Sequence, residues 1–469
     1  MNRHNFPFNP RAIATLAVTL AIANLFTAAA CNAAAPDRHV VIVCIDGFAA
    51  YLLNDPKAPV PTVRKLAKAG VVVEGGIRVS NPSITWPNHT TLVTGVRPEK
   101  HGVLANGMLV RGAPEVPVFV DPKKDQRDLV RVPTLFEAAR AAGMTTAEVN
   151  WPCMRGSKSL DDSFPDVPEQ VTHMTPRLRD ELISRGILAD ATDKTFMANS
   201  PPSRDLIWME TTCHLLRERK PNLLVLHLLN VDSTHHAEGA QSPPGYTANG
   251  FADMCLARVV AAVDEAGIRD KTTIIVLADH GFTLTPKAIR PNVLLRQQGL
   301  LTVTGAKIST AQIHVVPEGG IGLIYCTNPG TAPADRERAA KIFAGQEGVA
   351  DIVTPERMHE LGMPHPREYA QAPDLVLVAK DGYGVSGSAE GETFVALGTE
   401  AKVSAGSHGF VSTEPKMNAV CVISGAGIRA GATVPTAENI DIAPTVARLL
   451  GLTNFQADGK VLEGALATK

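Results

Sequence analysis

Several residues of types that commonly bind metal ions follow shortly after apolar runs of the chain, and one more lies in a loop near residue 408. They are, in chain order, Asp46, Asp232 with His236, Asp279 with His280, and His408. The runs 39–45, 222–229 and 272–277 are typical of strands, and ligands of open α/β sheets bind outside the carboxyl ends of strands. Taken singly, each Asp is also explained as a turn former or a helix cap. Together, carboxylate oxygens and imidazole nitrogens suit zinc or a similar first-row ion.

The spacing within two of these groups supports a shared site. Asp232 and His236 are four residues apart, so one helical turn would place both on the same face. Asp279 and His280 are adjacent at a strand end, where neighbouring side chains can splay around one ion. Two ions about 4 Å apart can stabilise both the attacking and the leaving oxygen of an in-line displacement. The pattern therefore predicts a two-metal hydrolytic site.

A candidate nucleophile lies in the segment 83–95, which is expected to be a loop leading into a helix that ends near Gly95. The hydroxyl of Thr85 would lie at the amino end of that helix, where the helix dipole and free N–H groups suit a phosphate. A metal ion beside this hydroxyl would make it nucleophilic. Thr85 or Ser83 could instead cap the helix, and the local sequence leaves both interpretations open.

The elements that must position these residues predict an α/β fold. The apolar runs are continuous rather than alternating, which is typical of strands covered by helices on both faces. Helices, most of them ending at Gly, are expected over 61–69, 133–142, 203–220, 247–266 and 439–450, and further strands at 374–378 and 418–423. Strands that alternate with helices predict a mostly parallel central sheet flanked by helices.

Residues 283–400 differ from the rest of the chain in their Gly and Pro content and in their short mixed strands, with one helix expected at about 333–343. We expect this segment to be an inserted, smaller cap domain. It would divide the catalytic domain into two parts, 36–282 and 401–469.

Residues 1–35 have the layout of a secretory signal peptide. A basic start precedes an apolar run, 12–26, and a stretch of small residues, and no acidic residue comes before Asp37. The run is shorter than the roughly 20 residues of a spanning helix, although a mitochondrial-type targeting segment or a membrane anchor is an alternative. Cys31 also weakly matches a bacterial lipoprotein cleavage site. The sequence predicts a secreted, periplasmic protein, with lipid anchoring at Cys31 as the alternative.

The bulk composition fits a globular protein with a large core. The chain has 469 residues, of which 45% are apolar and 20% charged, and its formal net charge is −2. This charge balance lacks the excess of Lys and Arg that nucleic-acid-binding proteins carry, and it argues against that class of protein. Seven cysteines are too few for a disulfide-dense scaffold, and one bridge among Cys153, Cys213 and Cys255 is left open. The sequence does not specify the oligomeric state.

Taken in order, the motifs resemble those of the nucleotide pyrophosphatase/phosphodiesterase family (type I phosphodiesterases) of the alkaline phosphatase superfamily. The resemblance spans about residues 39–450 and rests on the ordered set rather than on any one motif. The set is Asp46-Gly47-Phe48, Thr85-Trp86-Pro87-Asn88-His89, Thr91 to Gly95, His101-Gly102, Asn106, Asp232 with His236, Asp279-His280-Gly281 and Ser407-His408-Gly409. The resemblance implies an alkaline-phosphatase-like fold.

The resemblance also implies a role for each matching residue. One metal ion would be held by Asp46, Thr85, Asp279 and His280, and the other by Asp232, His236 and His408. Thr85 would attack phosphorus and form a covalent phospho-threonine, while Asn106 and the backbone N–H of Trp86 would stabilise charge on a phosphoryl oxygen. The ions of the family are usually zinc, so two Zn²⁺ are expected, with other divalent first-row metals as alternatives.

Substrate contacts are expected from Trp86 and Trp151, with plain core packing as the alternative for each. The chain departs from the resembled pattern at Ala49, where relatives often have Arg, and at His235, where they often have Gly. We expect His235 on the surface, with contact to the substrate as the alternative. These departures bear on substrate choice rather than on the metal site.

The function that follows is hydrolysis of phosphodiester or pyrophosphate bonds in a small-molecule phosphate ester. A phosphomonoesterase or a phosphonoacetate-hydrolase-like enzyme on the same site is the alternative, for which Arg111, Arg155 or Lys158 could supply a positive group from a loop. A non-catalytic binding protein on a degenerate scaffold is the alternative from another class.

Overall fold

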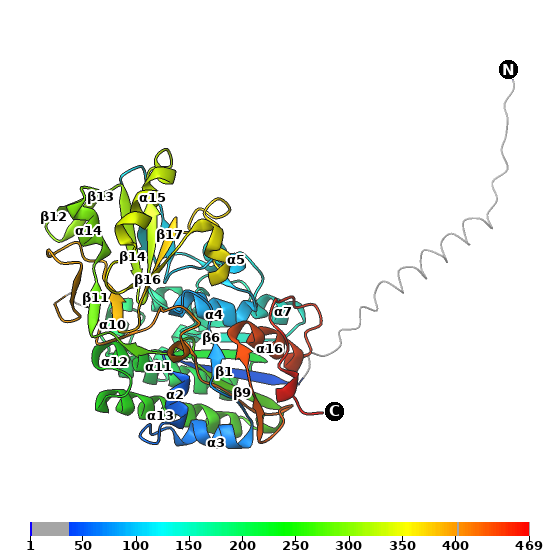
Figure 1. Ribbon diagram of the computed structural model, residues 1–469. Coiled ribbons are helices and arrows are strands. Elements are labelled where there is room, and N and C mark those ends of the chain that lie inside the picture. Colours follow the sequence, from blue (N-terminus) through cyan, green and yellow to red (C-terminus); the bar gives the residue numbers. More distant parts are fainter. Residues whose placement is uncertain (2–36, 401–402, 469) are drawn as a thin grey trace. The chain divides into compact units, whose positions relative to one another are not determined.

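The computed structural model describes Met1, residues 37–400 and residues 403–468, so the predicted signal peptide and Cys31 lie outside the described residues. The unit that begins at Asp37 is built around an eight-stranded sheet (Figure 1). Across the sheet the strands are β22 (Ala432–Val434), β2 (Val71–Val73), β21 (Cys421–Gly425), β9 (Thr272–Leu277), β1 (His39–Ile45), β8 (Leu223–Leu228), β6 (Thr146–Val149) and β7 (Asp162–Phe164). Only β21 runs antiparallel to its neighbours. The predicted α/β fold is confirmed.

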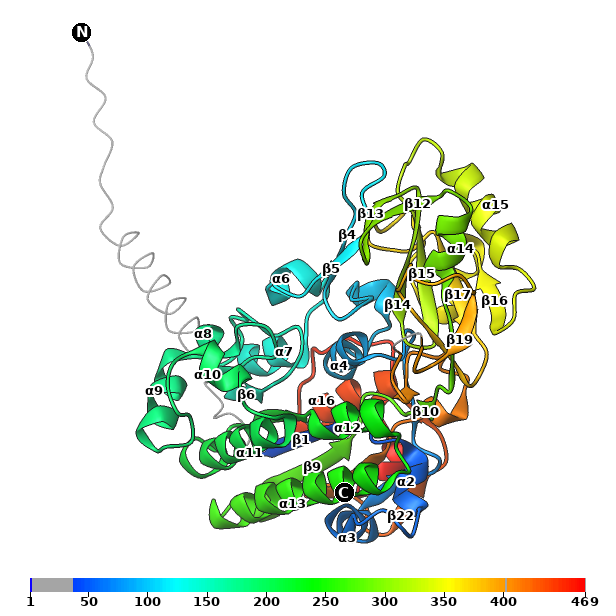
Figure 2. The same ribbon diagram turned by 90° about the vertical axis from the view of Figure 1, so that its left-hand side faces the viewer.

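Helices cover both faces of this sheet. On one face lie α3 (Pro61–Ala69), α11 (Pro201–Glu218) and α13 (Pro243–Glu265), and on the other lie α4 (Thr85–Thr94), α7 (Leu135–Ala141) and α16 (Ile442–Leu450) (Figures 1 and 2). Every residue of β1, β8 and β9 is buried. This double cover explains why these strands are continuous apolar runs.

The helix ends follow local chemistry. A capping box starts α7, since the Thr134 hydroxyl accepts from the Phe136 N–H and the Glu137 carboxylate accepts from the Thr134 N–H. Gly95 and Gly451 end α4 and α16 with φ of 69° and 76°, a conformation that glycine adopts without a Cβ penalty. Shorter helices are α2 (Ala50–Asn54), α5 (Pro98–His101), α6 (Gln126–Leu129), α8 (Gln170–His173), α9 (Pro176–Ser184), α10 (Asp193–Met197) and α12 (Asn230–Glu238).

The segment between β9 and β21 contains a second, antiparallel sheet. Its order is β14 (Ile313–Glu318), β15 (Ile321–Cys326), β17 (Leu375–Ala379) and β16 (Val349–Val353), with α14 (Pro291–Gln297) and α15 (Ala332–Phe343) beside it. Smaller pairings join β12 (Leu301–Thr304) to β13 (Lys307–Ala311), and β11 (Lys287–Ile289) to β18 (Tyr383–Val385) and β19 (Val395–Leu397). Where the chain leaves and re-enters the main body, β10 (Thr283–Leu284) pairs with β20 (Gly406–Ser407). A separate cap domain over 283–400 stays a prediction.

A hairpin of the main body, β4 (Met108–Val110) with β5 (Phe119–Asp121), packs against this second sheet. One apolar cluster joins residues beside and within the hairpin to the sheet, and includes Leu104, Ala105, Leu109, Val316, Leu323 and Val376. Arg111 reaches across as well: its Nη1 donates to Asp374 Oδ2 at 3.0 Å, and its guanidinium lies over the Tyr325 ring at 4.7 Å. The hairpin and the insertion therefore hold one another in place.

The cysteines within the described ranges are all free, including Cys153, Cys213 and Cys255, so the bridge left open by the sequence is not formed. None of the helices in this part of the chain is both long and apolar enough to cross a membrane.

Candidate active site

The carboxyl ends of three neighbouring strands bring the predicted acidic residues together. β1 pairs in parallel with β9 on one side and β8 on the other, in registers that end all three strands at one level. Asp46 follows β1 directly, and Asp279 follows β9 after one residue. Helix α12 begins just past β8 and carries Asp232 in its first turn and His236 one turn later.

The pairing of β10 with β20 adds His408 from the far end of the insertion. The strand β9 leads through Asp279 and His280 into β10, and β20 ends directly before His408. The rings of His280 and His408 stack with their centroids 3.6 Å apart. A residue about 130 positions later in the chain therefore joins the strand-end group.

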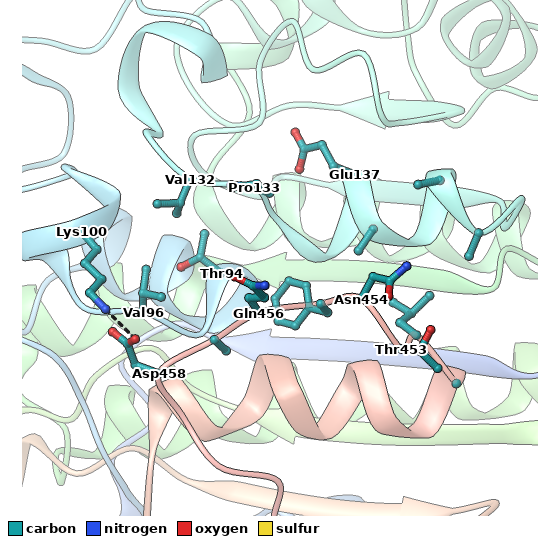
Figure 3. Close-up of a pocket in the computed structure, with 17 residues that line it drawn as sticks. Thr94, Val96, Lys100, Val132, Pro133, Glu137, Thr453, Asn454, Gln456 and Asp458 are labelled. Atoms are coloured by element: carbon teal, nitrogen blue, oxygen red, sulfur yellow. Dashed lines mark hydrogen bonds and ion pairs between the residues drawn. The ribbon is translucent and has the colours of Figure 1, made fainter.

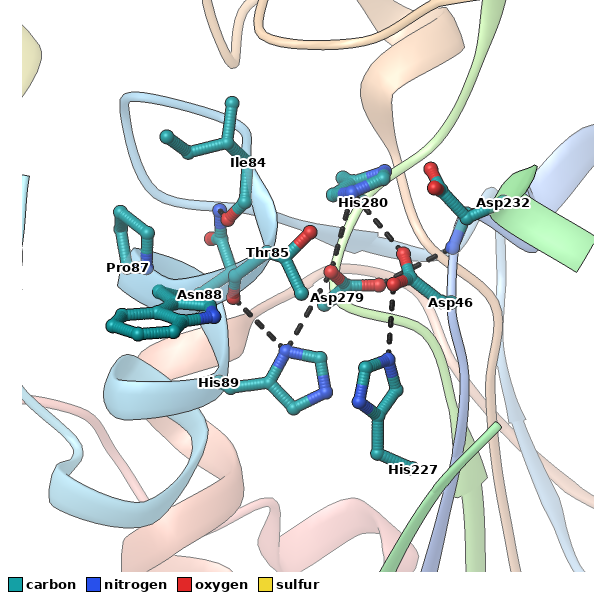
Figure 4. Close-up of polar contacts among 12 residues, drawn as sticks. Asp46, Ile84, Thr85, Pro87, Asn88, His89, His227, Asp232, Asp279 and His280 are labelled. Atoms are coloured by element: carbon teal, nitrogen blue, oxygen red, sulfur yellow. Dashed lines mark hydrogen bonds and ion pairs between the residues drawn. The ribbon is translucent and has the colours of Figure 1, made fainter. Parts of the chain in front are cut away.

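The first cluster consists of Asp46, Asp279 and His280, all of them fully buried (Figure 4). His280 Nε2 lies 3.3 Å from Asp46 Oδ1 and 3.2 Å from Asp279 Oδ2. The main-chain N–H of Gly47 donates to the other oxygen of Asp279 at 3.3 Å. Two carboxylate oxygens and one imidazole nitrogen thus face a common point.

The second cluster consists of Asp232, His236 and His408. Asp232 Oδ1 lies 3.4 Å from His236 Nε2 and 3.5 Å from His408 Nε2, and these two nitrogens are 3.1 Å apart. Ligand atoms of Asp46, Asp232 and His280 also lie within 4.8 Å of one another. The two clusters therefore adjoin.

The hydrogen bonds of the three histidines leave one nitrogen of each ring free for a cation. His236, His280 and His408 each place Nδ1 3.0–3.1 Å from a backbone carbonyl oxygen. A carbonyl oxygen only accepts, so Nδ1 carries the hydrogen and Nε2 of the neutral ring keeps its lone pair. The facing Nε2 atoms of His236 and His408 would repel one another unless a cation lay beside both.

Unpartnered buried atoms point to the same conclusion. Asp46 Oδ1, Asp232 Oδ1, Asp279 Oδ2 and His280 Nε2 are buried and have no hydrogen-bond partner among the described residues. Buried polar atoms without partners are costly and rare. Oxygen and imidazole nitrogen are ligands that zinc and related ions accept, so the donor set fits divalent cations.

The electrostatics of the clusters also favour a cation. Burial raises the pKa of Asp46 well above its usual range, and the Asp232 carboxylate raises it further. Burial, with Asp46 as a second cause, raises the pKa of Asp279. Burial lowers the pKa of His280 well below its usual range and that of His408 to about 4. A cation would keep the carboxylates ionised and the imidazoles neutral, as metal ligands must be.

Helix α4 presents Thr85 at its amino end beside the two clusters. Ile84 is the N-cap residue and no side chain caps the helix, while the Ser83 hydroxyl donates to the Phe410 carbonyl, so neither Ser83 nor Thr85 acts as the cap. In Figure 4 the hydroxyl of Thr85 points toward the first cluster. The side chain is 9% exposed.

The remaining predicted substrate contacts lie in different surroundings. Asn106 is exposed, and its Oδ1 accepts from the Trp86 N–H at 2.9 Å. Trp86 is only 4% exposed, and its Nε1–H donates to Asp166 Oδ2 at 3.0 Å. Trp151 is fully buried, with its ring edge-on to His89 at 4.6 Å. Substrate contacts of Trp86 and Trp151 stay predictions that this burial does not favour.

Sequence reasoning assigned no role to three residues that support the site. The Asp205 carboxylate accepts from the N–H groups of Leu229 and Asn230 at the start of α12. His227 Nε2 lies 2.9 Å from Asp46 Oδ2. His89 Nδ1 lies 2.9 Å from the Thr85 carbonyl oxygen. A histidine inside the apolar run 222–229 was the available signal for His227. The expectation that His235 lies on the surface is wrong, because its ring is buried edge-on against Phe282.

A hollow of about 670 Å³ lies at the opposite end of α4 from Thr85 (Figure 3). It is lined by Thr94 of that helix, by α7 and by the segment 451–458, and an ion pair between Lys100 and Asp458 stands at its edge. Its lining contains no His or Cys and none of the predicted ligands. It is therefore separate from the candidate metal centre.

A family model described as "Type I phosphodiesterase / nucleotide pyrophosphatase" matches residues 40–411, which include both clusters and Thr85. The chain belongs to this family. Relatives among type I phosphodiesterases include ectonucleotide pyrophosphatase/phosphodiesterase family member 3 of Rattus norvegicus, 24% identical over 247 residues, which are 52% of this chain and 25% of the relative. An uncharacterized pyrophosphatase/phosphodiesterase of Schizosaccharomyces pombe is 26% identical over 52% of this chain and 45% of that protein. The matched region thus spans less than half of these relatives.

Solved structures show the same fold. Murine ectonucleotide pyrophosphatase/phosphodiesterase 5 superposes with a TM-score of 0.68 at 19% identity, covering 92% of this chain and 100% of that one. An inactive variant of the murine protein, in complex with AMP, gives the same values. The similarity supports the alkaline-phosphatase-like architecture expected of type I phosphodiesterases.

Proposed function

We propose that the protein hydrolyses phosphodiester or pyrophosphate bonds in small phosphate esters, with Thr85 as the nucleophile. Family membership supports the reaction class. The observation that supports Thr85 as the nucleophile is that the segment 83–85 lies beside both clusters. The Ser83 carbonyl accepts from His408 Nδ1 at 3.0 Å, and the Thr85 carbonyl is 2.9 Å from His89 Nδ1, which is 3.6 Å from Asp279 Oδ2.

In this proposal Asp46, Thr85, Asp279 and His280 would hold one cation, and the second cluster would hold the other. Bound divalent cations, zinc in the first instance, would neutralise charge on the phosphoryl group and lower the pKa of the attacking hydroxyl. The ligand types support zinc.

The chain's own groups then carry out the displacement. The Thr85 oxygen attacks phosphorus, the bond from phosphorus to the leaving oxygen breaks, and water later hydrolyses the phospho-threonine. The amino end of α4 favours the anionic phosphoryl group. Asn106 accepts from the Trp86 N–H through Oδ1, which leaves its Nδ2 hydrogens free to donate to a phosphoryl oxygen.

Diester substrates are favoured over monoesters because two of the candidate positive groups are already paired. Arg111 binds Asp374 at 3.0 Å and Arg155 binds Asp125 at 3.0 Å, while Lys158 is exposed. A monoester carries additional charge on its terminal oxygens, which such a group would have to neutralise. The murine neighbour solved with AMP supports a nucleotide-sized substrate.

The direct test compares hydrolysis of bis-p-nitrophenyl phosphate with that of p-nitrophenyl phosphate, with and without a chelator. The proposal expects faster turnover of the diester and loss of activity with chelator. Preference for the monoester would support the phosphomonoesterase or phosphonate hydrolase instead. A protein that binds zinc but turns over neither substrate would support a non-catalytic binding role.

We also propose secretion to the periplasm by a signal peptide over 1–35, with attachment through Cys31 as the alternative, and a substrate-selecting cap over 283–400. The charge balance of the chain supports a small-molecule rather than a nucleic-acid partner. Mass spectrometry of the mature protein would reveal cleavage and any lipid on Cys31.

A further inference from the structure

We propose that His227 is a positioning residue that fixes the orientation of Asp46 for cation binding. This inference rests on the proposed function, since it assigns Asp46 to a cation. His227 belongs to no predicted ligand set, yet it is the one polar residue in the buried strand β8, whose sequence is LLVLHL. An apolar residue would serve the core equally well at this position, so the imidazole needs another explanation.

The hydrogen bond to Asp46 supplies that explanation. His227 Nε2 lies 2.9 Å from Asp46 Oδ2, and both side chains are 1% exposed. An ionised carboxylate only accepts, so Nε2–H donates to Oδ2. The other oxygen, Oδ1, has no hydrogen-bond partner among the described residues and lies 3.3 Å from His280 Nε2. Holding Oδ2 therefore directs Oδ1 toward the point that the first cluster shares.

The strand register explains why His227 can reach this carboxylate. In the parallel pair β1–β8, His227 lies opposite Cys44, which is two residues before Asp46. Side chains two residues apart point to the same side of a strand. His227 and Asp46 are thus on the same side of the sheet, one beside the other.

His227 is itself held rigidly on its far side. The Asn150 carboxamide donates to His227 Nδ1 at 3.2 Å and to the His227 carbonyl at 3.1 Å, and the Asn150 carbonyl oxygen lies 2.9 Å from Nδ1. Gln170 in turn donates to Asn150 Oδ1 at 2.9 Å, and Asn150 and Gln170 are fully buried. The His89 ring packs against the imidazole with centroids 4.4 Å apart. A donor fixed in this way can hold a ligand carboxylate in a single orientation.

The test measures cation binding rather than turnover. Purified protein is stripped with a chelator and titrated with Zn²⁺ against a chromophoric competitor, which yields a dissociation constant for each ion. His227→Leu removes the donor, and His227→Gln keeps an N–H donor at a similar reach. The matched control is His101→Leu, which removes another fully buried imidazole whose hydrogen bonds go to Thr91 and Val103 instead.

We expect His227→Leu to weaken one of the two sites by about 10- to 100-fold, the usual effect of losing a hydrogen bond to a metal ligand. His227→Gln and His101→Leu should each stay within about threefold of the wild type at both sites. Circular dichroism confirms that each variant is folded. Should His227→Leu not fold, the Gln variant decides: affinity near the wild type supports the role, and a tenfold loss or more overturns it.

The outcomes separate this inference from the function on which it rests. A folded His227→Leu variant that binds both ions like the wild type would overturn the positioning role and leave the two-cation proposal intact. A wild-type protein that binds no divalent cation would overturn the two-cation proposal itself.

Discussion

His101, in the short helix α5, should make the protein sensitive to acid. Its imidazole is fully buried, accepts from the Val103 N–H through Nδ1 at 3.2 Å and lies 3.0 Å from the Thr91 hydroxyl through Nε2. The Thr91 hydroxyl donates its own hydrogen to the Pro87 carbonyl, so Nε2–H donates to Thr91 and the ring is neutral. Protonation of Nδ1 would break the bond from Val103 and bury a charge.

The size of the effect follows from the pKa. Burial lowers the pKa of His101 from its usual 6.5 to about 3. Between these values the unfolded chain binds the proton and the folded chain does not, so stability rises with pH. The stabilisation is fully present above about pH 6.5 and is lost as the pH falls toward 3, at up to about 1.4 kcal/mol per pH unit and roughly 5 kcal/mol in total.

His101→Gln tests this reasoning, because glutamine can hydrogen-bond but does not titrate. Urea midpoints of chelator-stripped wild type and variant are measured from about pH 7 to about pH 4. We expect the wild type to be more stable at neutral pH, and the difference to shrink by about 1.4 kcal/mol per pH unit on acidification. If the stability of the two proteins changed with pH in parallel, the assignment of this acid sensitivity to His101 would be wrong.

Other substitutions test the candidate site. Thr85→Ala should keep both proposed cations, as measured by metal analysis, and lose at least about a thousandfold in turnover, because the proposed nucleophile is gone; wild-type rates would contradict the proposed mechanism. Asp232→Ala should reduce the metal content to about one ion per chain and abolish activity, since it removes the carboxylate of one cluster; two ions per chain would contradict the assignment. Gly320→Ala would place a Cβ 2.3 Å from the ring of Phe410, two residues after the candidate ligand His408, and should cost about 1–3 kcal/mol of stability by thermal unfolding. The exposed Gly330→Ala in the same insertion is its control, and equal melting temperatures for the two would argue against the clash.

Much of the fold could be predicted because burial on both faces leaves a direct trace in the sequence. β1, β8 and β9 are continuous apolar runs, and Asp46 and Asp279 follow their ends closely. Strands with a weaker sequence signal were not predicted. β6 mixes polar and apolar residues in the sequence TAEV, and β2 has only three residues. The antiparallel direction of β21 depends on its neighbours and has no local signal.

The site was harder to predict wherever tertiary packing decides the environment of a side chain. His235 and His236 are adjacent on α12 and both rings pack edge-on against Phe282, yet His235 is fully buried while Nε2 of His236 faces the second cluster. No property of either residue alone distinguishes them. His227 was missed for the same reason, since its partner Asp46 is distant in sequence and meets it only through the β1–β8 register.

The packing of the insertion against the hairpin β4–β5 limits how this protein can be re-engineered. Asn106 stands between Ala105 and Leu109, which pack into the same apolar cluster as β14 and β17, and Arg111 crosses to Asp374. A chimera that receives residues 283–400 from a relative would lose these contacts unless residues 104–121 were transplanted with them. The two segments constitute a single exchangeable module, although most of the main body separates them along the chain.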